Sequence, residues 1–228
     1  MNAMYDEFTD SQIPAINLIQ KMGYSWINQE ECIQKRGNIL SNVILEEILF
    51  TQLKEINSFE FKGERFHFSE SNIWAAINAL KNIQDEGLVK TNEKVYDLLT
   101  LGKSFMENIY GDQKSFTVKY IDWENIDKNI FHVTEEFVVE GPKESRRPDI
   151  VLFVNGIPFV VIENKRRDKN FSIGEGISQH IRNQTKSEGT PRLFHYAQIL
   201  LSVLPNEVKY AVTGTGAKFW SVWKYTCS

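Results

Sequence analysis

Two short apolar runs joined by an Asn-Gly pair constrain the fold of this chain more than any other part of its sequence. The runs are Ile150–Val154 and Ile157–Ile162, and Asn155-Gly156 separates them. A strand that is apolar on both faces is typical of the buried centre of a sheet. Asn-Gly is the pair that most favours a tight turn between antiparallel strands. The sequence therefore predicts a buried central hairpin.

Polar residues flank this hairpin at its open end. Arg147-Pro148-Asp149 precedes the first run, and Glu163-Asn164-Lys165 closes the second. An antiparallel hairpin brings both groups to the same end. Two carboxylates can hold Mg²⁺ while leaving positions open for water and phosphate, and a nearby lysine can orient water or neutralise developing charge. This combination favours phosphodiester hydrolysis, and the alternative is an ordinary solvated surface hairpin.

The pairing register of the two strands decides whether the two carboxylates can meet, because it sets which face of the hairpin Asp149 points to. Glu163 and Lys165 share a face because alternate strand residues point the same way. A strict two-residue loop would pair Val154 with Ile157 and turn Asp149 to the opposite face. An offset of one residue places Asp149 on the face of Glu163. We therefore predict a β-bulge, either at Gly156 or near Pro148.

The charge of the chain is unevenly distributed. The net charge is −4, yet the window 143–192 contains ten Lys and Arg against six Asp and Glu, which leaves +4 there and −8 elsewhere. A positive region around the hairpin is expected if a phosphate backbone approaches it, although solvated charges give the same pattern. The candidate DNA-binding residues are Arg147, Arg166, Arg167, Arg182 and Lys186.

Helical periodicity dominates the first half of the chain. A helix capped by Ser11 and ended by Gly23, a second over 38–56, and a third from Ser69 to Gly87 are expected. The second half changes to strand periodicity. Strands are expected at 115–122, 131–140, 199–204, 209–212 and 218–223, with a Gly174–Gly176 break and helices at 177–186 and 193–198. The prediction is an α/β fold with a mixed sheet, divided into a helical region 1–112 and a core 113–228.

Composition adds limits on location and metal chemistry. With 42% hydrophobic residues the chain is typical of a globular protein, and no apolar run reaches the roughly 18 residues of a membrane span. Cys32 and Cys227 indicate neither a zinc site nor a disulfide framework. The four histidines, His67, His132, His180 and His195, have no ligand spacing and are expected to be structural, with phosphate contact the alternative for His180. A cytoplasmic protein without a membrane partner is expected.

The string RRPDIVLFVNGIPFVVIENK resembles the PD-(D/E)xK nuclease superfamily, and more narrowly the N-terminal nuclease region of the R subunit of type I restriction enzymes. "LFHYAQILLSV" and "VTGTGAKFW" are similar to the segments that follow it in that family. The resemblance implies a restriction-endonuclease-like fold in which Asp149, Glu163 and the Asn164 carbonyl hold metal and Lys165 is catalytic. It also implies a Q-x-x-x-Y helix, where Gln179 fits but Asn183 stands at the tyrosine position.

The family implies further partners. In the parent subunit an ATP-driven DNA motor follows the nuclease region, but this sequence has no GxxxxGK[ST] phosphate loop, so ATP is expected only for motor domains outside it. The chain, ending at Ser228, is expected to be the nuclease part, acting on double-stranded DNA with modification and specificity subunits. The alternatives are a stand-alone nuclease and a catalytically silent DNA-binding or docking module.

Overall fold

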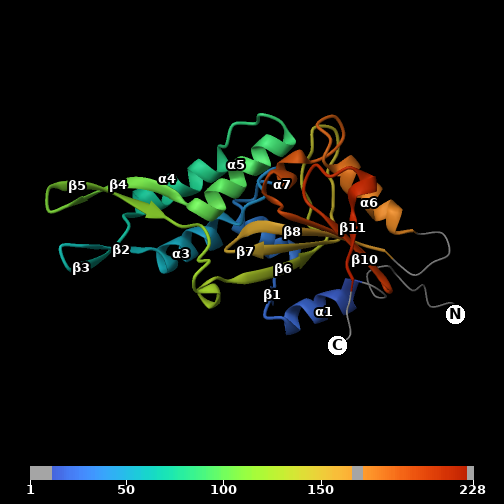
Figure 1. The fold of residues 1–228 in the computed structure, drawn as a ribbon, viewed down its shortest axis with the longest axis horizontal. Helices are drawn as coiled ribbons and strands as arrows, with labels where there is room; N and C mark the ends of the chain where they lie inside the picture. Colours follow the sequence, from blue (N-terminus) through green and yellow to red (C-terminus); the bar gives the residue numbers. More distant parts are fainter. Residues whose placement is uncertain (1–11, 166–171, 225–228) are drawn as a thin grey trace.

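The computed structural model describes residues 12–165 and 172–224, which fold around a seven-stranded mixed sheet (Figure 1). The strand order is β1-β6-β7-β8-β9-β10-β11. The strands are β1 (Ser25–Trp26), β6 (Phe131–Glu135), β7 (Ile150–Val154), β8 (Ile157–Asn164), β9 (Ile199–Leu204), β10 (Glu207–Ala211) and β11 (Ser221–Val222). The predicted mixed α/β architecture is confirmed.

Seven α-helices accompany the sheet in the described part of the chain. They are α1 (Ile13–Lys21), α2 (Gln29–Lys35), α3 (Glu46–Ile56), α4 (Glu70–Lys81), α5 (Leu88–Leu101), α6 (Ile173–Asn183) and α7 (Pro191–Tyr196), with short 3-10 helices η2 (Ile126–Lys128) and η3 (Ala217–Phe219). Within these residues no helix is long and apolar enough to cross a membrane.

The predicted central hairpin is β7–β8. Every residue of β7 is buried, and so is every residue of β8 except the half-buried Phe159. β7 pairs antiparallel with both β6 and β8, whereas β8 pairs parallel with β9. The chain reaches that parallel partner through α6 and α7, so the predicted order of three strands, a helical crossover and a strand is confirmed.

The two faces of the hairpin belong to different apolar clusters. Ile150, Leu152, Val160 and Ile162 pack with Ile16 of α1 on one face. Val151, Phe153 and Val161 join the larger cluster built with the helices of the other face. Figure 1 shows α1 on one side of the sheet and α4, α5 and α7 on the other. Burial on both faces explains why these strands carry apolar residues without alternation.

The hairpin contains a bulge, but not where we expected it. Val154 pairs with Ile157 across a two-residue turn, and the register shifts by one between Leu152 and Phe153, which leaves Phe159 as the extra residue. Asn155 and Gly156 both have positive φ, as a type I′ turn requires. Both predicted positions, Gly156 and Pro148, are therefore wrong, while the predicted offset is confirmed. Pro158 is the physical reason: it has no N–H for the ladder, and strand prolines concentrate at bulges.

Three helix predictions need correction. Residues 38–45 are not helical: Asn38 has a φ of 60°, and the Asn42 side chain bonds the Arg36 carbonyl and the Ile44 amide, so only α3 remains of that helix. The helix capped by Ser69 ends at Lys81, and Gly87, with a φ of 102°, instead precedes α5, which we did not predict. Ser69 itself caps α4 as expected.

The glycine-rich segment after the hairpin is helix and not a break. Ser172 and Glu175 form a capping box that starts α6, so Gly174 and Gly176 lie inside the helix. Near the C-terminus only Ser221–Val222 of the expected 218–223 strand is extended, because η3 occupies the residues before it. The strand expected over 131–140 ends at Glu135, since Glu136 has a φ of 51°.

The first helix forms where its apolar spacing predicted it. It ends at Lys21, shortly before Gly23, whose φ is 99°. The expected cap, Ser11, lies outside the described residues, as does Cys227.

Two antiparallel hairpins lie apart from the main sheet: β2 (Ser58–Phe61) with β3 (Glu64–His67), and β4 (Lys103–Ile109) with β5 (Asp112–Val118). Stacking of Phe59 on Phe116, with ring centroids 3.9 Å apart, joins them. They extend away from the sheet at the left of Figure 1. The expected division at residue 112 falls at the start of β5, and buried residues from both sides of it share one apolar cluster. The two-part division stays a prediction.

Candidate active site

The bulge places the two predicted carboxylates opposite each other. Beyond Phe159 the register pairs Ile150 with Ile162, so Asp149, just before β7, faces Glu163 near the end of β8. Both continue the row of Val151 and Val161, which lies on the face of the sheet that belongs to the larger apolar cluster. The exposed fraction is 7% for Asp149 and 0% for Glu163. Two acidic side chains thus meet inside the protein at one edge of the central hairpin.

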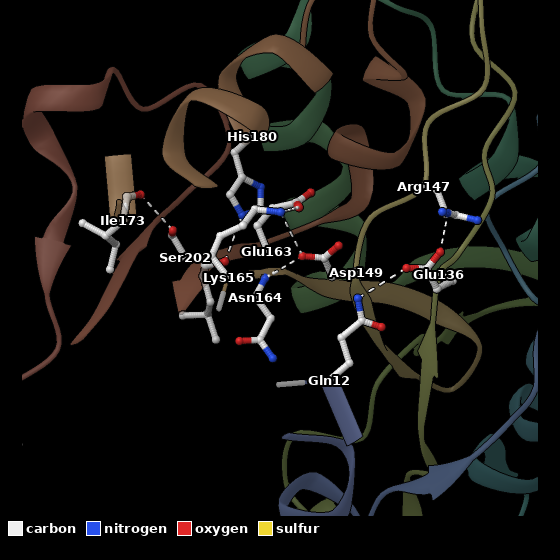
Figure 2. A network of polar contacts seen from close by, with 11 residues as sticks. Gln12, Glu136, Arg147, Asp149, Glu163, Asn164, Lys165, Ile173, His180 and Ser202 are labelled. Carbon is white, nitrogen blue, oxygen red and sulfur yellow. Dashed lines mark hydrogen bonds and ion pairs between the residues drawn. The ribbon is translucent and has the colours of Figure 1, made fainter. Parts of the chain in front are cut away.

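Lys165 completes the predicted trio. Its Nζ lies 3.4 Å from Oδ2 of Asp149 and 3.7 Å from Oε2 of Glu163. The amide of Asn164 donates a 2.7 Å hydrogen bond to the same Asp149 oxygen, and the amide of Lys165 donates to the Val203 carbonyl of β9 at 2.9 Å. Figure 2 shows the two carboxylates and the lysine converging from neighbouring strands.

Glu163 is electrostatically the least satisfied member of the group. Neither of its carboxylate oxygens accepts a hydrogen bond from a described residue. Burial raises its pKa well above the ordinary value, and the Asp149 carboxylate adds to that rise, while Lys165 opposes it. A buried acid without hydrogen bonds is costly. A cation between the carboxylates would relieve this penalty, so the residues present fit a divalent metal.

The structure limits how such a metal could be held. Among the described residues no group of three or more His, Cys, Asp and Glu forms a metal cluster. Asp149 and Glu163 would therefore need a backbone oxygen as well. The N–H of Asn164 points to Asp149, and in a strand the N–H and C=O of one residue point to the same side. The Asn164 carbonyl accordingly lies on the Asp149 side of β8.

Helix α6 closes the site from behind. A Cβ added at Gly176 would lie 2.2 Å from Oγ of Ser202 and 3.6 Å from Cβ of Glu163. Only a residue without a side chain lets the helix approach the sheet this closely. Ser202 adds a hydrogen bond of 3.0 Å to the Ile173 carbonyl at the start of the helix. The two glycines that we interpreted as a break therefore include a close-packing position.

His180 reaches the site from α6, and no motif in the sequence marks it. The side chain is fully buried, as the structural interpretation of the histidines requires, and Figure 2 shows it directed from the helix toward Lys165 and Glu163. Nε2 lies 2.9 Å from the Leu201 carbonyl of β9. Burial lowers the pKa of His180 to about 4, so the ring is neutral near pH 7. Its position i+4 from Gly176, on the same helix face, is the signal that could have found it.

Of the other predicted site residues, the structure describes Gln179, Arg147, Arg182 and Lys186. Gln179 is half-buried on α6, one turn from Gly176. Arg147, with 63% of its side chain exposed, forms an ion pair with Glu136. Arg182 is exposed on α6, and Lys186 forms an ion pair of 2.8 Å with Asp85. Arg166 and Arg167 lie outside the described residues.

Asn183, at the position where the resembling family has tyrosine, is buried. Its exposed fraction is 2%, and its carbonyl accepts a 2.7 Å hydrogen bond from the Thr190 amide. Its side-chain Oδ1 accepts no hydrogen bond from the described residues. The side chain is therefore buried at the end of α6 and is not displayed to solvent.

The mixed α/β fold carries a buried acidic site, and comparison with known protein families identifies the class to which this chain belongs. Residues 4–220 match the family described as the type I restriction enzyme R protein N terminus. The chain belongs to this family. The resemblance inferred from the RPD…ExK string is confirmed over most of the chain.

Curated relatives agree with this assignment. Two Methanocaldococcus jannaschii proteins carry the provisional names of type I restriction enzyme endonuclease subunits MjaIXP and MjaVIIIP. They are 30% and 33% identical to this chain over 217 and 203 residues, which is 92% and 84% of the chain. The type I restriction enzyme HindI endonuclease subunit of Haemophilus influenzae is 30% identical over 131 residues, or 57% of the chain.

The matched regions are small parts of these relatives. They cover 20% and 18% of the two archaeal proteins and 12% of the Haemophilus protein. The chain thus spans about a fifth of the length of the two archaeal relatives. It is related to endonuclease subunits through one region of those longer proteins.

Proposed function

We propose that this chain is the Mg²⁺-dependent DNA endonuclease domain of a type I restriction R subunit, with a PD-(D/E)xK fold and site. The observation that carries the proposal is the placement of Asp149 opposite buried Glu163, with the Lys165 ammonium 3.4 Å and 3.7 Å from their oxygens. Two carboxylates and a lysine at one strand edge suit phosphodiester hydrolysis.

Asp149, Glu163 and the Asn164 carbonyl would hold the metal. When bound, Mg²⁺ supplies charge neutralisation at the phosphate and a more acidic water. Asp149 is held in place by the protein itself, because the Asn164 amide donates a 2.7 Å hydrogen bond to one of its oxygens. The Glu163 oxygens, which accept no hydrogen bond from the described residues, supply the driving force, since a cation replaces the missing interactions of a buried acid.

Lys165 is the residue suited to manage protons and charge at the scissile phosphate. Its ammonium extends from the end of β8, and 11% of the side chain is exposed. In that position it can orient the attacking water or neutralise the developing negative charge. Gln179, half-buried on α6, is assigned a supporting role in the same site.

Binding of DNA would rely on charge and not on base contacts. Arg147 beside Asp149, Arg182 on α6, Lys186, and the Arg166-Arg167 pair that follows Lys165 in the sequence are the proposed phosphate contacts. Such contacts carry no sequence information. Sequence choice would therefore come from a separate specificity subunit.

The larger assembly belongs to this proposal as well. The relatives' names describe endonuclease subunits of type I restriction enzymes. ATP-driven translocation, modification and specificity subunits, and a cytoplasmic location are proposed for the complete subunit on that basis. ATP is assigned only to motor domains outside these residues.

Plasmid cleavage tests the proposal. Supercoiled plasmid is incubated with Mg²⁺ and either the 228-residue chain or a complete R subunit with its partner subunits and ATP. Asp149→Ala and Lys165→Ala are expected to abolish cutting. Lys62→Ala, which removes an ion pair between the turn of the remote β2–β3 hairpin and Asp112 of β5, is expected to leave cutting unchanged. Cutting that survives either site substitution contradicts the assignment.

The same experiment separates the alternatives. Cutting by the 228-residue chain alone, without ATP, would favour a stand-alone nuclease. Cutting only in the assembly with ATP would support the type I function. Binding of DNA without cutting in both settings would favour a silent DNA-binding module.

A further inference from the structure

His180 has one ring nitrogen with a partner and one without. Nε2 lies 2.9 Å from the Leu201 carbonyl, and because a carbonyl oxygen only accepts, Nε2 carries the proton. Nδ1 then presents a lone pair. That atom is fully buried and has no hydrogen-bond partner among the described residues. A buried acceptor in this condition calls for a donor.

We propose that His180 is a positioning residue for Lys165: its Nδ1 accepts the Lys165 ammonium when a divalent cation occupies the two carboxylates. This inference rests on the proposed nuclease function and deepens it. His180 acts through the lysine and does not touch the cation or the phosphate.

The contacts of Lys165 explain why a second acceptor is needed. The Lys165 ammonium lies 3.4 Å from Oδ2 of Asp149 and 3.7 Å from Oε2 of Glu163. A divalent cation needs the same carboxylates and repels the ammonium at short range. With a cation held by these carboxylates, Lys165 would have to move away from their oxygens and would then need another acceptor.

The ring of His180 faces the lysine (Figure 2). Figure 2 shows its ring directed from α6 toward Lys165 and Glu163. The positive charge of Lys165 is among the causes that lower the pKa of His180, after burial, so the two groups are electrostatically close. The neutral ring can accept an ammonium without charge repulsion.

The ring is held firmly in this orientation. Trp220 packs against it with ring centroids 5.3 Å apart, and Phe194 meets it edge-on at 6.4 Å. The indole Nε1 of Trp220 is itself a buried donor without a partner among the described residues. Trp220 is therefore the competing partner for Nδ1, and the test must distinguish it from Lys165.

Two substitutions separate the nitrogen atoms of His180. The side-chain oxygen of asparagine can occupy the Nδ1 position, and the side-chain amide nitrogen of glutamine can occupy the Nε2 position. His180→Asn thus keeps an acceptor for Lys165, whereas His180→Gln keeps the bond to Leu201. Mg²⁺ binding is titrated by isothermal calorimetry on the 228-residue protein without DNA, after circular dichroism and thermal unfolding have shown that each variant is folded.

We expect His180→Gln to weaken Mg²⁺ binding about tenfold, as loss of a supporting residue around a metal site commonly does. His180→Asn should bind within about twofold of wild type, by the same comparison. In a Lys165→Met background the His180→Gln loss should disappear, because the ammonium that needs placing is gone. Equal losses in both backgrounds would show a purely structural role.

Three outcomes overturn the proposal: a His180→Gln protein with wild-type Mg²⁺ affinity, a loss that persists in the Lys165→Met background, or a Trp220→Phe protein that reproduces the loss. The last would assign the Nδ1 lone pair to the indole. The wild-type protein tests the underlying metal site separately: if it does not bind Mg²⁺, the proposed nuclease site fails, and the His180 proposal, which rests on it, fails too. If the wild-type protein binds Mg²⁺, the three outcomes above concern His180 alone.

Discussion

The Asn164 amide donates a 2.7 Å hydrogen bond to Oδ2 of Asp149. One strand end of the hairpin therefore orients the acidic residue that opens the other. The contact is possible because the offset at Phe159 brings Asp149 level with the end of β8. One backbone bond thus fixes the first carboxylate, while the second, on Glu163, accepts no hydrogen bond from the described residues.

Replacing Glu163 should stabilise the metal-free protein and abolish Mg²⁺ binding. Burial raises the pKa of Glu163, so its ionised form opposes folding. Glu163→Gln removes that charge at nearly constant volume and should raise the free energy of unfolding by about 1–3 kcal/mol at pH 8. Urea denaturation without metal measures the gain, and calorimetry measures the lost Mg²⁺ binding.

The gain from Glu163→Gln should depend on pH in a defined direction. At pH values below the ordinary carboxyl range, Glu163 is protonated in both the folded and the unfolded states and imposes no charge penalty. As the pH rises, only the unfolded state ionises easily, so the advantage of the Glu163→Gln variant over the wild-type protein grows. A variant that is less stable than wild type at pH 8 would contradict this account.

Gly176→Ala should destabilise the protein because the new methyl group would lie 2.2 Å from Oγ of Ser202. We expect a loss of about 1–3 kcal/mol, typical of overpacking. Adding Ser202→Ala removes the clashing oxygen together with its hydrogen bond to the Ile173 carbonyl and leaves a contact of 3.3 Å to Cβ, so part of the loss should be recovered relative to Gly176→Ala alone. Thermal and urea unfolding measure both effects.

Gly174→Ala is the matched control for this prediction. Its added Cβ would lie 3.4 Å from Oγ of Ser172 at the helix start, which is ordinary contact. Alanine also favours a helix over glycine. This variant should be at least as stable as wild type. Equal destabilisation by the two substitutions would mean that close packing of α6 is not the cause.

His180 should make the protein acid-sensitive between pH 6.5 and pH 4. Burial lowers its pKa from 6.5 to about 4, so the unfolded state binds more protons than the folded state in that window. Stability is therefore complete above pH 6.5 and falls as the pH drops, by about 3 kcal/mol from this residue. Urea denaturation from pH 7 to pH 4 measures the slope. His180→Gln cannot titrate and should show a correspondingly shallower slope, while equal slopes would exclude His180 as the cause.

The ion pair between Arg147 and Glu136 should hold back DNA binding. Because the Glu136 carboxylate already pairs with the Arg147 guanidinium, it competes with phosphate for that group. Gln12 donates a 3.3 Å hydrogen bond to Glu136 and helps to hold the carboxylate in place. Arg147→Ala should weaken duplex binding about threefold to tenfold, and Glu136→Gln should strengthen it by a smaller factor. Fluorescence anisotropy with a labelled duplex at several salt concentrations measures both effects.

The salt dependence provides the decisive comparison for Arg147. Loss of one phosphate contact should reduce the salt slope by about one, whereas Lys62→Ala in the remote hairpin should change neither affinity nor slope. Figure 1 shows that hairpin at the end of the molecule away from the β8 terminus. An Arg147→Ala protein with unchanged affinity and slope would remove this residue from the DNA interface.

Much of the fold near the site could be predicted from local patterns. The apolar runs predicted β7 and β8 to within two residues, and Ser69 marked the start of α4. Residues 38–45 were misjudged because Val43 and its neighbours are apolar for tertiary reasons: they are fully buried in a turn held by Asn42. Apolar spacing alone does not distinguish a buried turn from a helix.

The sequence by itself determined the hairpin, its tight Asn155-Gly156 turn, its burial, and the requirement that the strands be offset by one residue for Asp149 to meet Glu163. These follow from neighbouring residues and from strand periodicity. Only the tertiary structure decided that the extra residue is Phe159, that Gly176 admits α6 to the sheet, and that His180 stands behind Lys165. The last two outcomes depend on β9, whose Leu201 and Ser202 contact α6 from more than twenty residues away in the chain. Contacts between distant segments leave no periodic signal in either segment, so the packed structure was needed to identify them.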